Sequence, residues 1–248
     1  MCIRDRPSLN VPAAAKAQQL ATLYTNGSTS EKQGALEVLG GLKTPESRKV
    51  LEGYVGELTA GSFPVELQVD LLDAVTTDGS ETLTKALEAY RAAKRADTLV
   101  QAFTDGLAKG GDFRAGQRVL FENPAAECTR CHTIRGRGAD VGPDLSRIGS
   151  TITRAQIVEA LVTPNARIAP GFGLVTVTLK GGETVSGTLK SESDGEVVLL
   201  AGTPPAERKI AKAEIASRTD PVSAMPPLGL ILKPREVRDL VEFLSALR

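Results

Sequence analysis

Two cysteines and the only histidine of the chain lie within one segment, Cys128-Thr129-Arg130-Cys131-His132. Two cysteines separated by two residues and followed directly by histidine are typical of covalent haem attachment. Each thiol adds to one vinyl group of the porphyrin, and one turn of chain between the cysteines spans two vinyl groups on neighbouring pyrroles. The following imidazole then lies under the ring, where it binds iron. The segment predicts one covalent haem c, with Cys128 and Cys131 as attachment residues and His132 as an axial ligand.

Other kinds of cysteine site fit the sequence less well. A zinc site commonly uses four Cys, His or carboxylate ligands, whereas this chain has one cysteine pair and one histidine. A thioredoxin-like redox pair follows a β-strand, but the residues before Cys128 have the pattern of an amphipathic helix. Two buried cysteines that happen to lie near a histidine are the structural alternative. Cys2 is the only other cysteine, so a disulfide framework is excluded.

Met225 is the only methionine besides Met1, and it lies in a proline-rich segment, residues 223–227. A thioether is a soft ligand that stabilises ferrous iron, and a His/Met pair raises the reduction potential of a haem. Methionine more often fills a gap in a hydrophobic core, but this one is not on an apolar helix stripe. We therefore predict that Met225 is the second axial ligand.

A glycine-rich loop follows the histidine and contains Gly142-Pro143-Asp144. An iron-bound imidazole needs a partner for its other ring nitrogen, and a backbone carbonyl often supplies it. The carbonyl of Pro143 is the predicted partner of His132. The alternative is a plain turn, because Gly-Pro-Asp is also common turn chemistry.

Helices are predicted on both sides of the cysteine segment. Residues 11–108 have apolar residues at helical spacing, and the pattern of Leu36–Leu42 recurs weakly in Val69–Val75. Such a recurrence suggests antiparallel helix pairs of a short HEAT-like α-solenoid, with an ordinary helical bundle as the alternative. Three further helices are expected from capping signals, over residues 113–122, 153–162 and 234–248. Gly116 would allow the last of these to approach the first closely.

The segment 172–218 has a different pattern, in which apolar residues alternate with polar ones. Gly181-Gly182 and Asp194-Gly195 are hairpin signals. The segment predicts about five short antiparallel strands that close into a small β-barrel. No set of residues in it resembles a catalytic site.

Composition and charge limit the classes of function. The 248 residues are enough for two or three domains. Thirty basic and thirty acidic residues give a net charge of zero, which favours neither nucleic acid nor an anionic membrane as partner. No run of apolar residues is long enough to predict a transmembrane helix. Residues 1–6 resemble translated sequencing-adapter sequence, so we expect a non-native leader, with the natural N-terminus and any signal peptide upstream.

The motifs, in their order along the chain, resemble a class I cytochrome c. They are Gly116 to Phe121, the Cys-x-x-Cys-His segment, Gly142-Pro143-x-Leu145, Met225-Pro226 and a C-terminal amphipathic helix. The resemblance is closer to the planctomycete-type haem-binding family, in which a cytochrome c domain ends a long chain with HEAT-like repeats and a dehydrogenase-like β-propeller. Segments 142–145, 168–171, 175–180 and 223–226 match that family. The resemblance covers residues 30–248 and is specific in the part that contains the cysteine segment.

The expected fold is mainly α with a β insertion. The leader 1–6 precedes a HEAT-like α-helical domain, 7–109; a class I cytochrome c domain, 110–171 and 219–248, is interrupted by the small β-barrel, 172–218. In the resemblance Cys128 and Cys131 form the thioether links, His132 and Met225 bind the iron, and Pro143 orients His132. The chain departs from ordinary class I cytochromes because the β-rich segment separates His132 from Met225 along the sequence.

The predicted function is that of a monohaem c-type cytochrome that carries single electrons. We expect no catalytic centre in this chain, which would be the electron-transfer part of a larger oxidoreductase. An attached or partner dehydrogenase would donate electrons, and a cytochrome or other redox protein would accept them. Arg135, Arg137 and Arg147 would contact haem propionates or the partner, or are simply solvated.

Two alternatives remain open from the sequence. One is a haem-based sensor or peroxidase, which needs a labile sixth ligand, and the other is an interaction module without haem. Thioether attachment requires a maturation machinery that operates outside the cytoplasm. A periplasmic or otherwise extracytoplasmic location is therefore expected.

Overall fold

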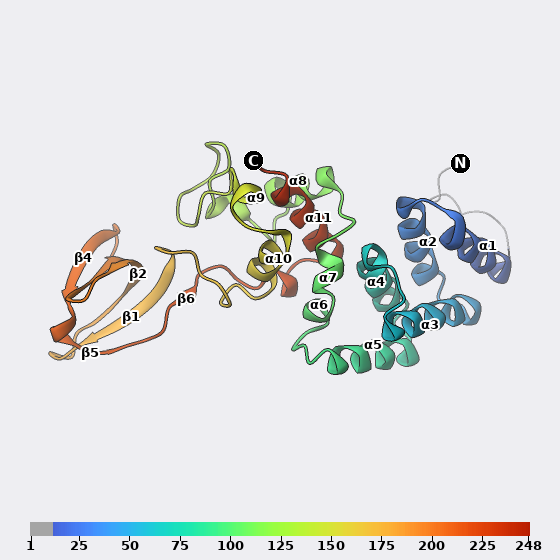
Figure 1. Cartoon of the computed structure of the whole chain (residues 1–248), viewed down its shortest axis with the longest axis horizontal. Helices are drawn as coiled ribbons and strands as arrows, with labels where there is room; N and C mark the ends of the chain where they lie inside the picture. Colours follow the sequence, from blue (N-terminus) through green and yellow to red (C-terminus); the bar gives the residue numbers. More distant parts are fainter. Residues whose placement is uncertain (1–11) are drawn as a thin grey trace.

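The computed structural model describes residues 12–248, so the predicted leader, residues 1–6, lies outside the described residues. Within the described part there are eleven α-helices and one sheet of six strands, and the fold is mixed α and β. Figure 1 shows a long molecule with N-terminal helices at one end, a second group of helices in the middle and the sheet at the other end.

The N-terminal helices pack around one hydrophobic cluster. Their bounds are α1 (Ala13–Asn26), α2 (Thr29–Leu42), α3 (Pro45–Ala60), α4 (Gln68–Asp78) and α5 (Glu81–Ala93). The predicted start of α3 is confirmed: Thr44 is its N-cap and accepts a hydrogen bond from the Ser47 backbone, with proline at the first helical position.

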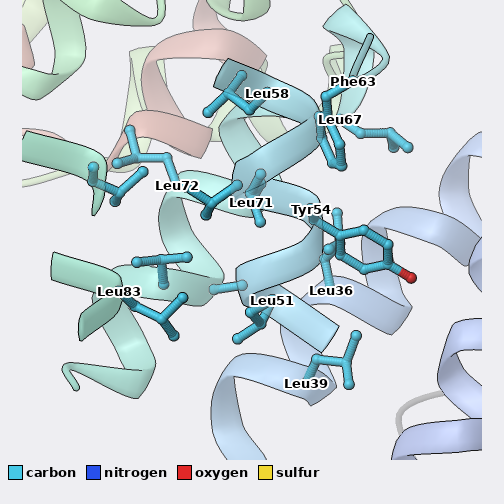
Figure 2. Packing of buried hydrophobic residues seen from close by; sticks show 14 of the residues in the cluster. Leu36, Leu39, Leu51, Tyr54, Leu58, Phe63, Leu67, Leu71, Leu72 and Leu83 are labelled. Carbon is cyan, nitrogen blue, oxygen red and sulfur yellow. The ribbon is translucent and has the colours of Figure 1, made fainter. Parts of the chain in front are cut away.

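The recurrent segments Leu36–Leu42 and Val69–Val75 lie in α2 and α4, which pack side by side. Gly40 permits the contact, because a Cβ atom there would lie 2.6 Å from the Cα atom of Ala74. Figure 2 shows the buried leucines of α2, α3, α4 and α5 in contact around this cluster. Leu36, Val38 and Leu39 and their counterparts Val69, Leu71 and Leu72 are all buried. The exposed Glu37 and Gly41 instead correspond to the buried Asp70 and Ala74.

A second group of helices surrounds a second hydrophobic cluster. It consists of α7 (Thr104–Leu107), α8 (Phe113–Glu122), α9 (Ile148–Thr151), α10 (Arg154–Val162) and α11 (Pro234–Ser245). Helix α6 (Leu99–Ala102) contacts both clusters, because Ala102 is buried in the first and Val100 packs against the second. The predicted capping residues are confirmed: the side chains of Asp112 and Thr153 accept hydrogen bonds from the first turns of α8 and α10.

The last helix is shorter than predicted. It ends at Ser245 rather than continuing to Arg248. The carbonyl oxygen of Leu247 accepts a hydrogen bond from the Gly149 backbone at 3.0 Å, and the Leu247 side chain is buried in the second cluster. The N–H groups of Ala246 and Leu247 donate to Phe243 and Leu244, three residues back, so the chain tightens after Ser245.

Helices α8 and α11 cross at Gly116, as its lack of a side chain predicts. A Cβ atom at Gly116 would overlap the carbonyl oxygen of Asp239 and lie 2.9 Å from the Cβ atom of Phe243. The crossing brings together two segments from opposite sides of the sheet insertion. Their contact completes the second cluster.

The β-rich segment forms an open antiparallel sheet, so the prediction of a closed barrel is wrong. The strand order is β4-β3-β2-β1-β5, and β6 pairs with the beginning of β1. Their bounds are β1 (Gly173–Leu179), β2 (Thr184–Glu192), β3 (Glu196–Ala201), β4 (Ala206–Ala211), β5 (Ile215–Arg218) and β6 (Val222–Ser223). The two predicted hairpins, β1–β2 and β2–β3, are confirmed.

Closure of the barrel would require the two edge strands, β4 and β5, to pair with each other. They are joined by a short 3₁₀ turn, Lys212–Glu214, and do not pair. The backbone N–H of Lys212 donates to Gly195, and that of Lys180 donates to Glu214. These backbone groups therefore bond to the hairpin turns. One face of the sheet packs its own small cluster of valine, leucine and isoleucine side chains.

Within residues 12–248, every helix is too short or too polar to cross a membrane.

A buried group of ion pairs connects α4 to α11. Arg238 donates to the Asp70 carboxylate at 2.7 Å, and both side chains are almost fully buried. Arg235 lies 3.1 Å from Asp70 and 3.0 Å from Asp73. Burial raises the pKa of the Asp70 carboxyl, whereas the positive charges of Arg238 and Arg235 act to lower it. This charged contact joins the N-terminal helices to the second group of helices.

Gly116→Ala should lower the free energy of unfolding by about 1–3 kcal/mol, because α8 and α11 must move apart to accommodate the methyl group. Urea unfolding of the two proteins measures the difference. Gly53→Ala is the matched control, since nothing lies within 4 Å of a Cβ atom at that helical position. The control should be neutral or stabilising. Equal stability of Gly116→Ala and the natural protein would show that the crossing is not tightly packed.

Asp70→Ala should lower the free energy of unfolding by about 3–5 kcal/mol, because it leaves the buried guanidinium of Arg238 without its main partner. Thermal or urea unfolding provides the measurement. Glu81→Ala removes the exposed Lys85–Glu81 pair and should change stability little. A similar small effect for both variants would contradict the structural role assigned to Asp70.

Candidate functional site

The cysteine segment forms one short turn at the end of the connection from α8. Residues Cys128–Arg130 are a 3₁₀ turn, and the backbone N–H groups of Cys131 and His132 both donate to the Cys128 carbonyl, at 3.2 and 2.9 Å. Glu127 begins the turn in a left-handed conformation with φ of 42°. The two cysteines are therefore separated by a single turn, as the sequence predicts.

The two thiols have different surroundings. Both are free, with Cys128 half-buried against the second cluster and Cys131 exposed. Burial raises the pKa of the Cys128 thiol. One sulfur therefore lies at the edge of the apolar cluster while the other is accessible from solvent.

The loop after His132 folds back over the cysteine turn through backbone hydrogen bonds. Three carbonyl groups of the turn accept from three N–H groups of the loop: Thr129 from Ala139 at 3.0 Å, Cys131 from Gly142 at 2.7 Å and Thr133 from Leu145 at 2.9 Å. The Thr133 hydroxyl adds a bond to the Ala139 carbonyl at 2.9 Å. The turn is thus fixed by the loop on one side and by the second cluster on the other.

His132 contacts the predicted carbonyl. Its Nδ1 atom lies 2.7 Å from the carbonyl oxygen of Pro143. A carbonyl oxygen only accepts hydrogen bonds, so Nδ1 carries the proton and Nε2 of the neutral ring keeps its lone pair. The Gly142 backbone lies against the ring, because a Cβ atom there would be 2.7 Å from His132 Cε1. Orientation and tautomer of the imidazole are both set, and its free nitrogen is the one that binds a metal ion in such an arrangement.

Met225 lies in the loop between β6 and α11. Its half-buried side chain packs against the same hydrophobic cluster as Cys128 and Leu145. Its backbone N–H donates to the Ser223 hydroxyl at 3.1 Å, and the Ser223 N–H donates to Asn165 Oδ1 at 2.7 Å. The structure therefore brings Met225 to the cluster that supports the cysteine turn, despite their separation in sequence.

Exposed apolar side chains lie in both loops that contain the predicted ligands. Among the residues that the structure describes, Val141 is 65 % exposed, Leu230 70 % and Ile231 41 %. Val141 precedes the glycine that touches the His132 ring, and the other two follow Met225. A contiguous exposed apolar patch is typical of a binding surface. These three side chains belong to the two loops in which the sequence predicts His132 and Met225 as ligands.

Two of the loop arginines, Arg135 and Arg137, make contacts within the protein. The guanidinium carbon of Arg137 lies 5.0 Å from the centre of the Phe121 ring, which is a cation–π contact with α8. The Arg135 backbone has φ of 49° and its N–H donates to the Ser146 hydroxyl. Arg137 thus has a packing role that the sequence did not indicate.

Asn165 and Ser223 are the residues near the site that sequence reasoning missed. A serine two residues before Met225 is the local signal of a hydroxyl–backbone turn. The participation of Asn165 has no local signal, because it depends on the return of the chain from the sheet.

Within residues 12–248, no three His, Cys, Asp or Glu side chains are grouped to hold a metal ion.

Comparison with known proteins adds no family assignment. No protein-family model matches the chain, and no curated protein is significantly similar to it. The residues of this chain and their geometry are therefore the basis for assigning a function.

Gly142→Ala should displace the His132 ring and weaken its bond to Pro143, since the added methyl group would lie within contact distance of the ring. Nitrogen NMR of the imidazole should show one tautomer in the natural protein and a mixture of tautomers in the variant. Gly41→Ala is the control, because a Cβ atom at Gly41 meets nothing within 4 Å. An unchanged tautomer in Gly142→Ala would contradict the packing role of Gly142.

Proposed function

We propose that this chain is a monohaem c-type cytochrome that carries single electrons, with the class I-like arrangement of the planctomycete-type haem-binding family. One observation carries the proposal: the only histidine directly follows two thiols on one turn, and its Nδ1 atom is bonded to Pro143 at 2.7 Å. This leaves Nε2 free for iron beside two cysteines at the attachment spacing.

Four side chains would hold the haem. Cys128 and Cys131 would form the thioether bonds, and His132 and Met225 would be the axial ligands. Bound haem supplies a one-electron couple between ferric and ferrous iron. Pro143 keeps the imidazole in one tautomer, and the second cluster provides apolar contacts to Cys128 and Met225. If His132 and Met225 both bound the iron, no position would be left open for a substrate.

Donor and acceptor belong to the same proposal. A dehydrogenase, attached in a longer chain or separate, would supply single electrons, and a cytochrome or other redox protein would accept them. The HEAT-like N-terminal helices would serve as the scaffold that holds the electron-transfer unit. The location would be periplasmic or otherwise extracytoplasmic, because covalent haem attachment requires the maturation machinery found there.

Expression with a cytochrome c maturation system tests the proposal. We expect the natural chain to gain the mass of one haem, which persists under denaturing conditions. The double variant Cys128→Ala, Cys131→Ala should lose attachment completely. Cys2→Ala is the matched control and should attach haem as the natural chain does. A natural chain without haem, in cells that mature another c-type cytochrome, would contradict the proposal.

The optical spectrum of the reduced protein with and without carbon monoxide tests the axial ligands. The natural protein should bind carbon monoxide slowly, because the Met225 thioether must first leave the iron, and Met225→Ala should bind it rapidly. Rapid binding by the natural protein would instead favour a sensor or peroxidase with a labile sixth ligand.

A further inference from the structure

The sheet leaves and rejoins the helical part of the molecule at one narrow place. Strand β6 pairs with the beginning of β1, with Gly173 opposite Ser223 and Leu174 opposite Val222. Figure 1 shows this paired segment between the sheet and the middle group of helices. We call Gly173–Leu174 and Val222–Ser223 the neck.

Two hydrogen bonds at Ser223 of the neck link Asn165 to the backbone of Met225. Asn165 Oδ1 accepts from the Ser223 N–H at 2.7 Å, and the Ser223 hydroxyl accepts from the Met225 N–H at 3.1 Å. Asn165 follows α10, whose residues Ile157, Val158, Leu161 and Val162 are buried in the second cluster. The backbone of Met225 is therefore connected, in two steps, to a helix of that cluster.

Close packing at the neck supports the same connection. A Cβ atom at Gly173 would lie 2.8 Å from the Cβ atom of Pro221, so β1 and the chain before β6 approach as closely as glycine permits. If residues 166–222 were a long flexible loop, bringing its two ends together would cost closure entropy. Because β1 and β6 pair at the neck, the two ends of the insertion are already held close together, as they would be by a short loop.

We propose that Asn165 and Ser223 are positioning residues that hold Met225 where its thioether binds the iron, a proposal that rests on the function proposed above. The neck explains how a sheet is accommodated between the two axial ligands of one site. Neither residue touches the iron; each acts through the backbone of Met225. Loss of either residue would therefore change how often the Met225 thioether leaves the iron and would not change attachment of the haem.

The test uses the full chain with haem attached. Ser223→Ala and Asn165→Ala each remove one acceptor from the connection, whereas Ser223→Thr and Asn165→Asp keep an acceptor oxygen. Ser186→Ala is the matched control, because Ser186 bonds to Thr176 at 2.8 Å within the same sheet. Asn165 is exposed, so its replacement removes the bond without opening a core cavity. Urea unfolding of every variant checks that the fold is retained.

Carbon monoxide binding to the ferrous protein measures how often Met225 leaves the iron. The two alanine variants should bind it roughly two- to tenfold faster than the natural chain, the size expected for loss of one hydrogen bond. The absorption band that reports sulfur ligation of ferric iron should weaken in both. Amide hydrogen exchange at Met225, which does not depend on electron transfer, should be faster in Ser223→Ala. The threonine, aspartate and Ser186→Ala variants should resemble the natural chain.

Two failures can be told apart. If the natural chain carries haem, Met225→Ala binds carbon monoxide rapidly and both alanine variants behave as the natural chain, the positioning role is overturned while the proposed function stands. If the natural chain carries no haem, the proposed function fails and this inference fails with it.

Discussion

The close crossing of α8 and α11 is the contact on which the rest of the site depends. Gly116 has no side chain, and the carbonyl of Asp239 occupies the space where one would lie. The two helices come from opposite sides of the inserted sheet, and both contribute buried side chains to the second cluster. Because α8 leads into the cysteine turn and α11 follows the Met225 loop, this one contact determines that the two predicted ligand segments meet on one cluster.

The cysteine turn is organised by the chain itself. The loop that follows His132 returns its N–H groups to the carbonyls of the turn, so few backbone groups there remain without partners. The same loop brings Pro143 to Nδ1 and Gly142 to the face of the ring. A site formed in this way needs little further ordering when a ligand binds, which reduces the entropic cost of binding. The preference for one tautomer follows from a backbone contact, with no charged partner involved.

Local signals made much of this structure predictable. Asp112, Thr153 and Thr44 mark helix starts because a cap needs only four consecutive residues. The Gly-Gly and Asp-Gly pairs mark the hairpins because a turn is equally local. The His132–Pro143 contact was predictable because both residues belong to one short loop. Closure of the sheet was not, because it depends on whether two distant edges pair, and here the 3₁₀ turn between β4 and β5 bonds to hairpin turns instead. The contact of Gly149 with Leu247 and the bond of Ser223 to Asn165 each join residues far apart in the sequence, so no local signal predicts either contact.

Helix α11 packs against two neighbours, and different side chains make the two contacts. Its apolar side packs on α8 in the second cluster, whereas Arg235 and Arg238 face α4 and pair with Asp70 and Asp73. Buried ion pairs contribute little net stability but tolerate few alternative arrangements, since moving one partner leaves the other charge unpaired. The N-terminal helices are therefore held in one orientation relative to the cysteine turn. A partner that binds those helices would therefore be held in one position relative to His132 and Met225.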